Sequence, residues 1–163
     1  MIPYGRHSIS SDDIDEVVKV LQGDWLTTGP YVRNFENELA VTSGSKYATA
    51  VTSGTAALHV AYSAAGINKG SKVLTSPMTF SATAATAIQL GANVQFSDID
   101  LETGLLDISI LESAVDTTTA VVTAVDYAGN PSQIDQLREI QKHNNFLILE
   151  DAAHSIGGTY KGC

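Results

Sequence analysis

Apolar residues near the start of the chain recur at helical spacing. A first stripe lies on one face of a helix that Ser11 can cap and Gly23 ends. Its members are Ile14, Val17, Val18 and Leu21. Pro30 suits the first turn of a second helix, whose stripe includes Val32, Phe35 and Leu39. The sequence therefore predicts that two amphipathic helices open the chain.

Further along, short β-branched runs alternate with helical stretches. The predicted strands are residues 47–51, 72–75, 93–96, 119–125 and 146–149. The predicted helices are residues 56–65, 80–90, 108–115 and 132–143. Strands separated by helices indicate βαβ units and a parallel sheet with helices on both faces. We therefore expect an α/β fold, a three-layer α/β/α sandwich with a mostly parallel sheet whose strand order the pattern does not give.

Composition excludes several classes of partner. The 163 residues suit one domain by length, and they carry nine Lys and Arg against eighteen Asp and Glu. With no basic run, nucleic acid and anionic membrane surfaces are not expected partners. The one cysteine, Cys163, allows no internal disulfide. The first residues lack the charged head and apolar stretch of a signal peptide, so we expect a cytoplasmic protein.

In parallel sheets, ligands bind beyond the carboxyl ends of the strands. Residues 53–55, 126–131 and 150–154 follow predicted strands. Free amides at a helix start after Ser53-Gly54-Thr55, together with the two hydroxyls, would suit a phosphate group. The alternative is an ordinary capped turn between strand and helix.

A second candidate segment is the apolar run 147–149, which leads into Glu150 and Asp151. A buried aspartate needs a positive partner or several donors, and a protonated pyridine nitrogen is such a partner. The alternatives are an Asp that caps the next turn, or a metal ligand with His154. Without a second His or Cys motif we predict no metal. Phe80, directly after a strand, either stacks on a flat ring or packs in the core.

Together, these segments resemble the DegT/DnrJ/EryC1/StrS family of sugar aminotransferases. Any one segment is weak evidence, but their order along nearly the whole chain is strong evidence. The matching segments are Trp25-Leu26-Thr27-Thr28-Gly29-Pro30 with Phe35-Glu36, Ser53-Gly54-Thr55-Ala56-Ala57-Leu58-His59, Pro77-Met78-Thr79-Phe80-Ser81-Ala82-Thr83, Ser97-Asp98-Ile99-Asp100, Val125-Asp126-Tyr127-Ala128-Gly129-Asn130 and Glu150-Asp151-Ala152-Ala153-His154.

The resemblance implies a fold-type-I large domain that binds pyridoxal 5'-phosphate (PLP). It implies that Gly54, Thr55 and Ala56 hold the cofactor phosphate and that Phe80 stacks on the ring. It also implies that Asp151 pairs with the pyridine nitrogen and that His154 lies near the ring hydroxyl.

The resemblance further implies an aminotransferase that moves an amino group from glutamate to a nucleotide-linked 4-keto-6-deoxy sugar. Thr27, Thr28 and Gly29 would border this substrate. Many members carry His where this chain has Asp126, another expected substrate contact. The segment Asp-aromatic-Ala-Gly-Asn resembles the branch that acts on UDP-sugars on the route to pseudaminic acid, a polysaccharide component.

In this family a Schiff-base lysine and a second phosphate-binding Ser follow the Asp151 segment, and a small C-terminal domain comes later. We expect residues 1–163 to be the N-terminal part of the PLP-binding large domain, with no catalytic residue of its own and no activity alone. The lysines all occupy predicted surface positions: Lys19, Lys46, Lys69, Lys72, Lys142 and Lys161.

Two other functions remain open. One is a PLP-dependent sugar dehydratase of the same family, in which His replaces the lysine. The other is a non-catalytic domain that binds a phosphate ligand or a partner chain. We also expect a homo-oligomer, because family members are dimers and because strands absent from this chain would leave apolar side chains with less cover. The side chains concerned are Val121, Val122, Leu147 and Ile148.

Overall fold

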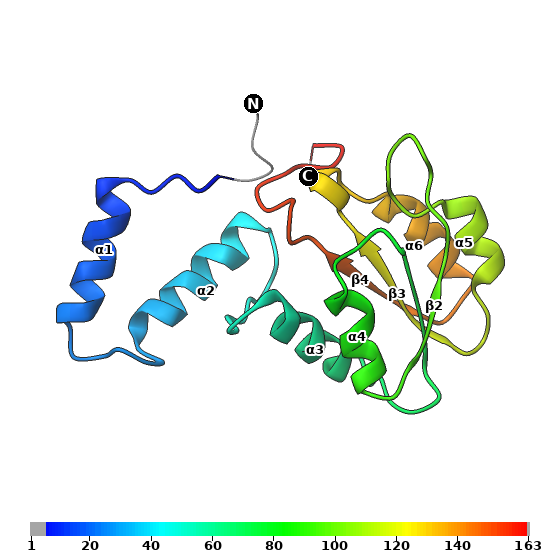
Figure 1. The fold of residues 1–163 in the computed structure, drawn as a ribbon, viewed down its shortest axis with the longest axis horizontal. Helices are drawn as coiled ribbons and strands as arrows, with labels where there is room; N and C mark the ends of the chain where they lie inside the picture. The colour runs from blue at the N-terminus through cyan, green and yellow to red at the C-terminus, as the bar shows by residue number, and fades with distance from the viewer. Residues whose placement is uncertain (1–5, 163) are drawn as a thin grey trace. The chain divides into compact units, whose positions relative to one another are not determined.

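The chain divides into two units, residues 1–50 and residues 51–163. A computed structural model describes residues 6–162 (Figure 1). Cys163, with its expected lack of a disulfide, and the first five residues lie outside the described residues. Within the described part, no helix is long and apolar enough to cross a membrane.

The first unit holds two helices, α1 (Ser11–Gln22) and α2 (Pro30–Thr42). Both match the predicted stripes, but the cap of α1 is Ser10 and the prediction of Ser11 was wrong. Ser10 Oγ accepts from the Asp13 amide at 3.2 Å, and the Asp13 carboxylate accepts from the Ser10 amide at 2.7 Å. The carboxylate three residues after the cap explains the shift, because the two groups satisfy each other in a capping box.

The second unit contains a sheet of four parallel strands in the order β2-β1-β3-β4. Strands β1 (Lys72–Thr75), β2 (Asn93–Phe96) and β3 (Thr119–Val125) have the predicted bounds. Strand β4 (Leu147–Asp151) begins one residue later and ends two residues later than predicted. It continues because Val125 of β3 pairs with Asp151. The predicted strand at 47–51 was wrong: among the described residues no strand pairs with it, and Tyr47 is 76% exposed.

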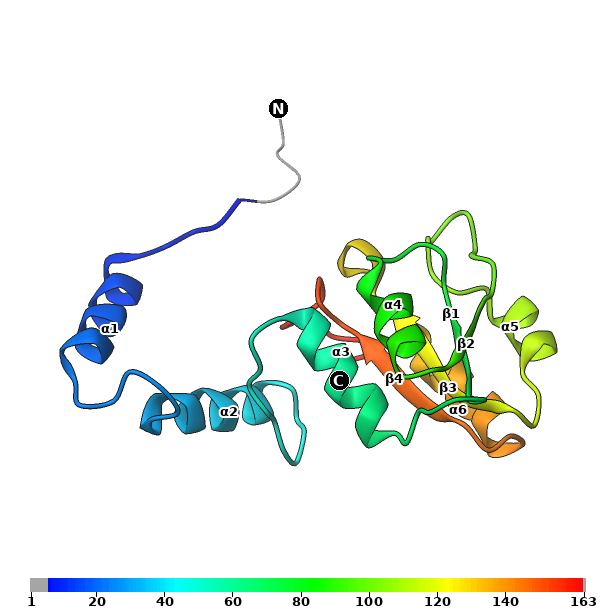
Figure 2. The ribbon, with the colours of Figure 1, turned by 60° about the horizontal axis from the view of Figure 1, so that its bottom comes forward.

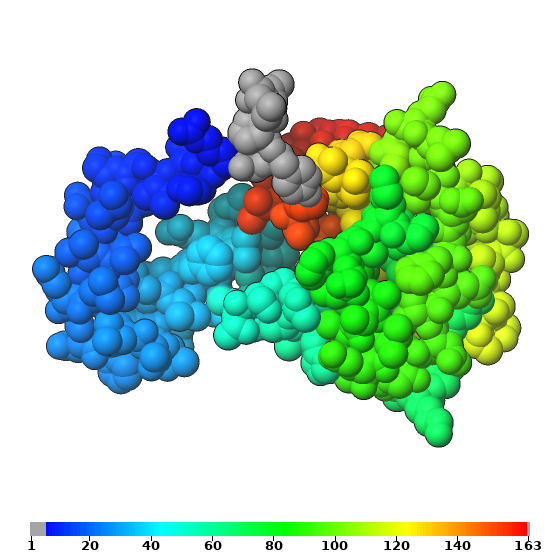
Figure 3. Space-filling model, in the orientation of Figure 1, coloured from blue at the N-terminus to red at the C-terminus, as the bar shows by residue number. Residues whose placement is uncertain are grey.

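Helices cover both faces of this sheet (Figure 2). On one face, α3 (Gly54–Ala64) and α4 (Ala82–Gln89) pack over a core that includes Tyr62 and Val121. On the other face, α5 (Ile108–Ala114) and α6 (Ile134–Lys142) pack over a core that includes Val122. Neighbouring strand residues thus enter opposite cores, as pleating requires. The predicted α/β sandwich is confirmed, and Figure 3 shows the green and yellow-green segments forming one continuous packed surface.

The strand order creates a switch point between β1 and β3. From β1 the chain moves outward to β2, and from β3 it moves the other way to β4. Helix α4 follows β1 on one face, while the 3-10 turn Tyr127–Gly129 and α6 follow β3. At this point Thr75 Oγ1 donates to the Thr123 carbonyl oxygen at 3.0 Å, with both residues buried. Crevices beyond the carboxyl ends of strands at such a point are where open α/β sheets bind ligands.

Candidate cofactor and substrate site

Asp151 occupies the last position of β4, and its side chain is half buried. Its Oδ2 atom accepts a hydrogen bond from Thr83 Oγ1 at 2.7 Å. Among the described residues, Oδ1 has no hydrogen-bond partner. One oxygen of the carboxylate is therefore held by the protein, while the other remains open to a cationic N–H group from outside.

A buried polar network lies behind this contact. The hydroxyl of Tyr62, which is fully buried, donates to the Thr83 carbonyl oxygen at 2.9 Å and lies 2.7 Å from Thr123 Oγ1. Burial raises the pKa of Tyr62 to about 12; the Thr123 hydrogen bond opposes this shift and the Asp151 charge adds to it. Sequence reasoning missed Tyr62, Thr83 and Thr123, although a Tyr inside a helix of small residues was a visible signal.

Phe80 lies at the turn that opens α4. Its carbonyl oxygen accepts from the Thr83 amide at 3.1 Å, so the turn that carries Phe80 also carries the partner of Asp151. The Phe80 side chain is 75% exposed and belongs to neither core of the described residues. An exposed ring at this place has a free face on which a flat ligand can stack.

The first turn of α3 offers donors to an anion. Ser53 Oγ caps the helix by accepting from the Ala56 amide at 3.1 Å, so one amide expected to bind phosphate is already engaged. The amides of Gly54 and Thr55 have no partner among the described residues, and no acid lies in this turn. Figures 1 and 2 show this turn on the side of the sheet where β4 ends. A helix start with free amides and a positive dipole end fits a phosphate.

Asp126 is bound by the protein itself. It is 3% exposed, its Oδ1 accepts from the Ser132 amide at 2.9 Å, and its Oδ2 accepts from Ser155 Oγ. Both oxygens therefore anchor the loops that follow β3 and β4. The pKa of the neighbouring Glu150 is raised, first by burial and then by the charge of Asp126. The expected contact between Asp126 and a substrate stays a prediction.

The loops after β3 and β4 approach each other at Gly129. Its φ is 83°, and a Cβ atom there would lie 3.0 Å from the His154 carbonyl oxygen. A side chain at Gly129 would therefore be strained and crowded. The side chain of His154 is exposed, and its place near a cofactor hydroxyl stays a prediction. Residues 6–162 contain no group of three or more His, Cys, Asp or Glu side chains placed for a metal ion.

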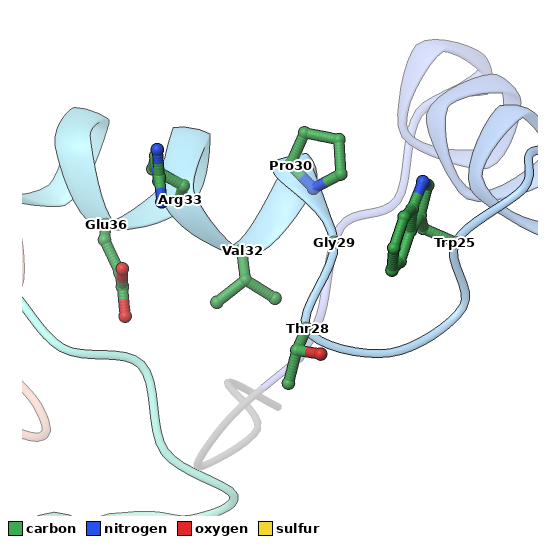
Figure 4. A pocket seen from close by; sticks show the side chains of 7 residues that line it. All are labelled: Trp25, Thr28, Gly29, Pro30, Val32, Arg33 and Glu36. Atoms are coloured by element: carbon green, nitrogen blue, oxygen red, sulfur yellow. The ribbon is translucent and has the colours of Figure 1, made fainter.

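A separate hollow of about 310 Å³ lies within the first unit (Figure 4). Thr28 and Gly29 line it, whereas Thr27 does not; the other lining residues are Trp25, Pro30, Val32, Arg33 and Glu36. The Trp25 ring stands beside Gly29 and Pro30, while Val32 and Glu36 project to one side of α2. A Cβ on Gly29 would lie 2.7 Å from Trp25 Cβ, so only glycine leaves the loop undisturbed. Substrate binding by Thr27, Thr28 and Gly29 stays a prediction.

Family membership follows from comparison with known proteins. The model of the DegT/DnrJ/EryC1/StrS aminotransferase family matches residues 7–163. This chain belongs to that family. It is 42% identical over 160 residues to the spore coat polysaccharide biosynthesis protein SpsC of Bacillus subtilis (strain 168), a match that covers 98% of this chain and 41% of SpsC.

Solved structures of relatives share the fold. The putative sugar aminotransferase Spr1654 from Streptococcus pneumoniae, in its PLP form, is 30% identical with a TM-score of 0.92, over 99% of this chain and 45% of that one. A GDP-4-keto-6-deoxymannose-3-dehydratase is 30% identical with a TM-score of 0.92, over 98% of this chain and 43% of that one.

Aminotransferases of this family depend on PLP. The chain spans about two fifths of the length of the curated relatives it matches, at 41% and 42%.

Proposed function

We propose that this chain forms part of a PLP-dependent sugar aminotransferase. The observation that carries the proposal is the half-buried Asp151 carboxylate, with one oxygen held by Thr83 and the other open at the carboxyl end of a parallel sheet. The proposed reaction moves an amino group from glutamate to a nucleotide-linked 4-keto-6-deoxy sugar. Membership in the DegT/DnrJ/EryC1/StrS family supports the reaction type.

The residues present fit the cofactor. When bound, PLP would supply an electron-withdrawing ring that stabilises negative charge at the carbon next to the amino nitrogen and so allows the amino group to be transferred. We propose that Asp151 pairs with the pyridine nitrogen, that the exposed Phe80 ring covers one face, and that His154 lies near the ring hydroxyl. The two free amides of α3 and the Thr55 hydroxyl would hold the phosphate, with Ala56 contributing only if Ser53 releases it.

Within the described part of the second unit, no lysine forms an ion pair or hydrogen bond with Asp151. Four lysines form ion pairs elsewhere: Lys19 with Glu16, Lys72 with Asp116, Lys142 with Glu139 and Lys161 with Asp135. We propose that residues 1–163 form the N-terminal part of the PLP-binding domain. The amine that engages the cofactor would then come from outside the described residues, and the chain alone would not turn over.

The likeness to a dehydratase at a TM-score of 0.92 supports a second candidate, a PLP-dependent sugar dehydratase. The residue in the position of the lysine would decide between them, with His in the dehydratase.

For the aminotransferase, the segment Asp126 to Asn130 supports a UDP-linked amino sugar on the route to pseudaminic acid as the substrate. SpsC is named for spore coat polysaccharide biosynthesis, which supports a related role for this chain. We propose a cytoplasmic location for that role.

We also propose that the chain forms homo-oligomers along β4. Within residues 6–162 this strand pairs only with β3, and Leu147 is 52% exposed. A groove of about 260 Å³ runs beside it, lined by Ala61, Tyr62, Ala64, Ala65, Val121, Leu147, Ile148 and Leu149. The expectation that Val121 and Val122 would have less cover was wrong, because Val121 lies in one core at 1% exposure and Val122 in the other at 0%. An open strand edge beside apolar groups recruits another strand.

A binding titration tests the cofactor assignment. PLP is titrated against the wild-type chain, Asp151→Asn and the control Asp15→Asn, whose carboxylate is exposed on α1. We expect non-covalent binding that Asp151→Asn weakens by about tenfold or more, because the ring loses its charge partner. The control should bind as the wild type does, and borohydride should leave no stable adduct. Equal affinity in Asp151→Asn would refute the assignment, and no binding by the wild type would favour a non-catalytic partner-binding domain.

A further inference from the structure

Two threonines on α4 use their hydroxyls in different ways. Thr83 and Thr86 are both buried, at 0% and 1% exposure. Thr86 Oγ1 donates back to the Ala82 carbonyl oxygen of its own helix at 2.8 Å, which is the common arrangement for a helical Thr. Thr83 Oγ1 donates instead to Asp151 Oδ2 at 2.7 Å, across to the end of β4. The Thr83 hydroxyl therefore connects a helix to the candidate cofactor ligand.

The number of hydroxyl hydrogens available fixes which group is the donor in each of these hydrogen bonds. A carboxylate can only accept, so the single hydroxyl hydrogen of Thr83 goes to Asp151. The 2.7 Å contact between Thr79 Oγ1 and Thr83 Oγ1 must then have Thr79 as its donor. The hydroxyls of Thr79 and Thr83 thus form a chain in which every hydrogen points toward the Asp151 carboxylate. Such chains polarise each link and favour the charged acceptor at their end.

The backbone of Thr83 is held by a second set of hydrogen bonds. The Thr83 carbonyl oxygen can only accept, so the Tyr62 hydroxyl donates to it at 2.9 Å. The 2.7 Å contact between Tyr62 and Thr123 then has Thr123 Oγ1 as the donor. Tyr62 comes from α3 and Thr123 from β3, so this network ties the first turn of α4 to the neighbouring helix and to the sheet. The backbone from which the Thr83 hydroxyl reaches Asp151 is therefore held in place.

We infer that Thr83 is a positioning residue for the cofactor, and this inference rests on the proposed function. Its hydroxyl orients Asp151 so that Oδ1 faces the ring nitrogen, and Thr79 and Tyr62 orient Thr83 in turn. A carboxylate with one oxygen fixed and one open presents a single acceptor direction to its ligand. Without the Thr83 hydroxyl, the Asp151 side chain would rotate among its rotamers and lose part of that fit.

The test measures binding of two ring ligands to the chain and its variants. One ligand is PLP, and the other is its 1-deaza analogue, in which carbon replaces the ring nitrogen. The variants are Thr83→Val, which keeps the shape and loses the hydroxyl, and Thr83→Ser, which keeps the hydroxyl. Thr86→Val is the matched control, because it removes an equally buried hydroxyl from the same helix. Circular dichroism confirms that each variant is folded.

We expect Thr83→Val to weaken PLP binding by about tenfold, the effect of losing one charge-assisted hydrogen bond. Thr83→Ser should restore most of the affinity, and Thr86→Val should bind as the wild type does. The 15N chemical shift of bound, labelled PLP should move toward the unprotonated nitrogen in Thr83→Val alone. With the 1-deaza analogue, which offers no nitrogen to Asp151, the difference between Thr83→Val and the wild type should disappear.

Other outcomes overturn the inference in distinguishable ways. Equal PLP affinity in Thr83→Val and Thr86→Val would show that Thr83 only packs, and would leave the proposed function intact. An equal loss with both ligands would show that Thr83 does not act through the nitrogen. No binding of either ligand by the wild type would remove the cofactor site and the inference together. Should Thr83→Val not fold, Thr79→Val removes the hydroxyl that donates to Thr83 and should weaken PLP binding by a smaller factor. Unchanged PLP binding in Thr79→Val would contradict a role for the Thr79–Thr83–Asp151 hydrogen-bond chain.

Discussion

The Asp126 amide donates to the Asp151 carbonyl oxygen at 3.1 Å, which joins two candidate site residues at the ends of β3 and β4. Their side chains nevertheless have different surroundings. Asp126 accepts from Ser132 and Ser155 with both oxygens, whereas Asp151 accepts from Thr83 with one. The two carboxylates at adjacent strand ends therefore have different roles. Asp126 holds the loops in place, and Asp151 remains available to a ligand.

Replacing Asp126 tests its role in holding the loops. Asp126→Ala leaves the buried Ser132 amide without its acceptor, and it leaves the Ser155 hydroxyl only its longer contact with the Ala152 carbonyl oxygen at 3.3 Å. We expect the free energy of unfolding in urea to fall by about 2 kcal/mol, because removing a charged acceptor from a buried amide is costly. Ser155→Ala, which removes one donor and keeps the other, should cost about 1 kcal/mol. Unchanged stability in Asp126→Ala would contradict the anchoring role.

Tyr62→Phe should destabilise the unit of residues 51–163. It removes a buried hydroxyl that donates to the Thr83 carbonyl oxygen and accepts from Thr123. We expect a loss of about 1–2 kcal/mol in thermal or urea unfolding, because two buried groups lose their partner. The control Tyr31→Phe changes a Tyr that is 44% exposed and should have little effect. A stable Tyr62→Phe protein would show that the network contributes nothing to folding.

The same pair of proteins gives a pH dependence. Because burial raises the pKa of Tyr62 to about 12 from 10.0, the folded state holds this proton more tightly than the unfolded state. The resulting stability is complete below pH 10 and decreases as the pH rises through about 12. Melting temperatures between these values should fall faster in the wild type than in Tyr62→Phe. Parallel pH profiles would contradict the raised pKa.

Glu150→Gln should raise stability above acidic pH. Burial and the nearby Asp126 charge raise the pKa of Glu150 above its ordinary 4.5, so folding favours the protonated carboxyl group. The wild type therefore loses stability as the pH rises from 4.5 through the raised value, and the neutral amide avoids this loss. Unfolding should be compared at pH 4 and pH 7 with Glu112→Gln on α5 as the control. A Glu150→Gln protein that is less stable than the wild type at pH 7 would contradict the predicted gain in stability.

Gly29→Ala should disturb the loop around Trp25. The added Cβ would lie 2.7 Å from Trp25 Cβ, which is too close for either atom to remain in place. Since Trp25 is the only Trp, its fluorescence reports this loop alone, and we expect a shifted emission maximum. Gly23→Ala, where a Cβ meets its nearest atoms at 3.4 Å, should leave the emission unchanged. Identical spectra in the two variants would contradict the described loop.

Self-association is the last prediction. Leu147→Lys places a charge beside the open edge of β4, where Leu147 is 52% exposed. Charges on an edge strand oppose pairing with a second strand. Light scattering across a dilution series should show oligomers of the wild type and a shift toward monomer in Leu147→Lys. Leu101→Lys, at a residue 92% exposed and distant in sequence, serves as the control. A wild type that is monomeric at every concentration would refute the proposal.

Local chemistry explains how much of the fold could be predicted from the sequence. Strands β1, β2 and β3 were found at their observed bounds because short β-branched runs end at Gly, Ser or Asp. Pro30 marked the start of α2 because its fixed φ suits a first helical turn. The residues 47–51 have the same local pattern but form no strand, because a strand also needs a neighbour to pair with.

Local sequence patterns likewise revealed only some residues of the candidate site. Its exposed or terminal residues, Thr55, Phe80 and Asp151, were recognisable because each belongs to a short segment with its own pattern. The partners that hold Asp151 were not recognisable, because Thr83 lies 68 positions away and Tyr62 meets Thr123 across 61 positions.

Apart from residues 47–51, the sequence by itself determined the element types, the α/β class and the segments that carry chemistry, since these depend on side chains a few residues apart. Only the tertiary structure decided the strand order β2-β1-β3-β4, the extension of β4 to Asp151 and the different roles of Asp126 and Asp151. These depend on which distant backbone and hydroxyl groups meet. A hydrogen-bond partner is selected by position in space, and many orders of the same strands would satisfy the same local pattern.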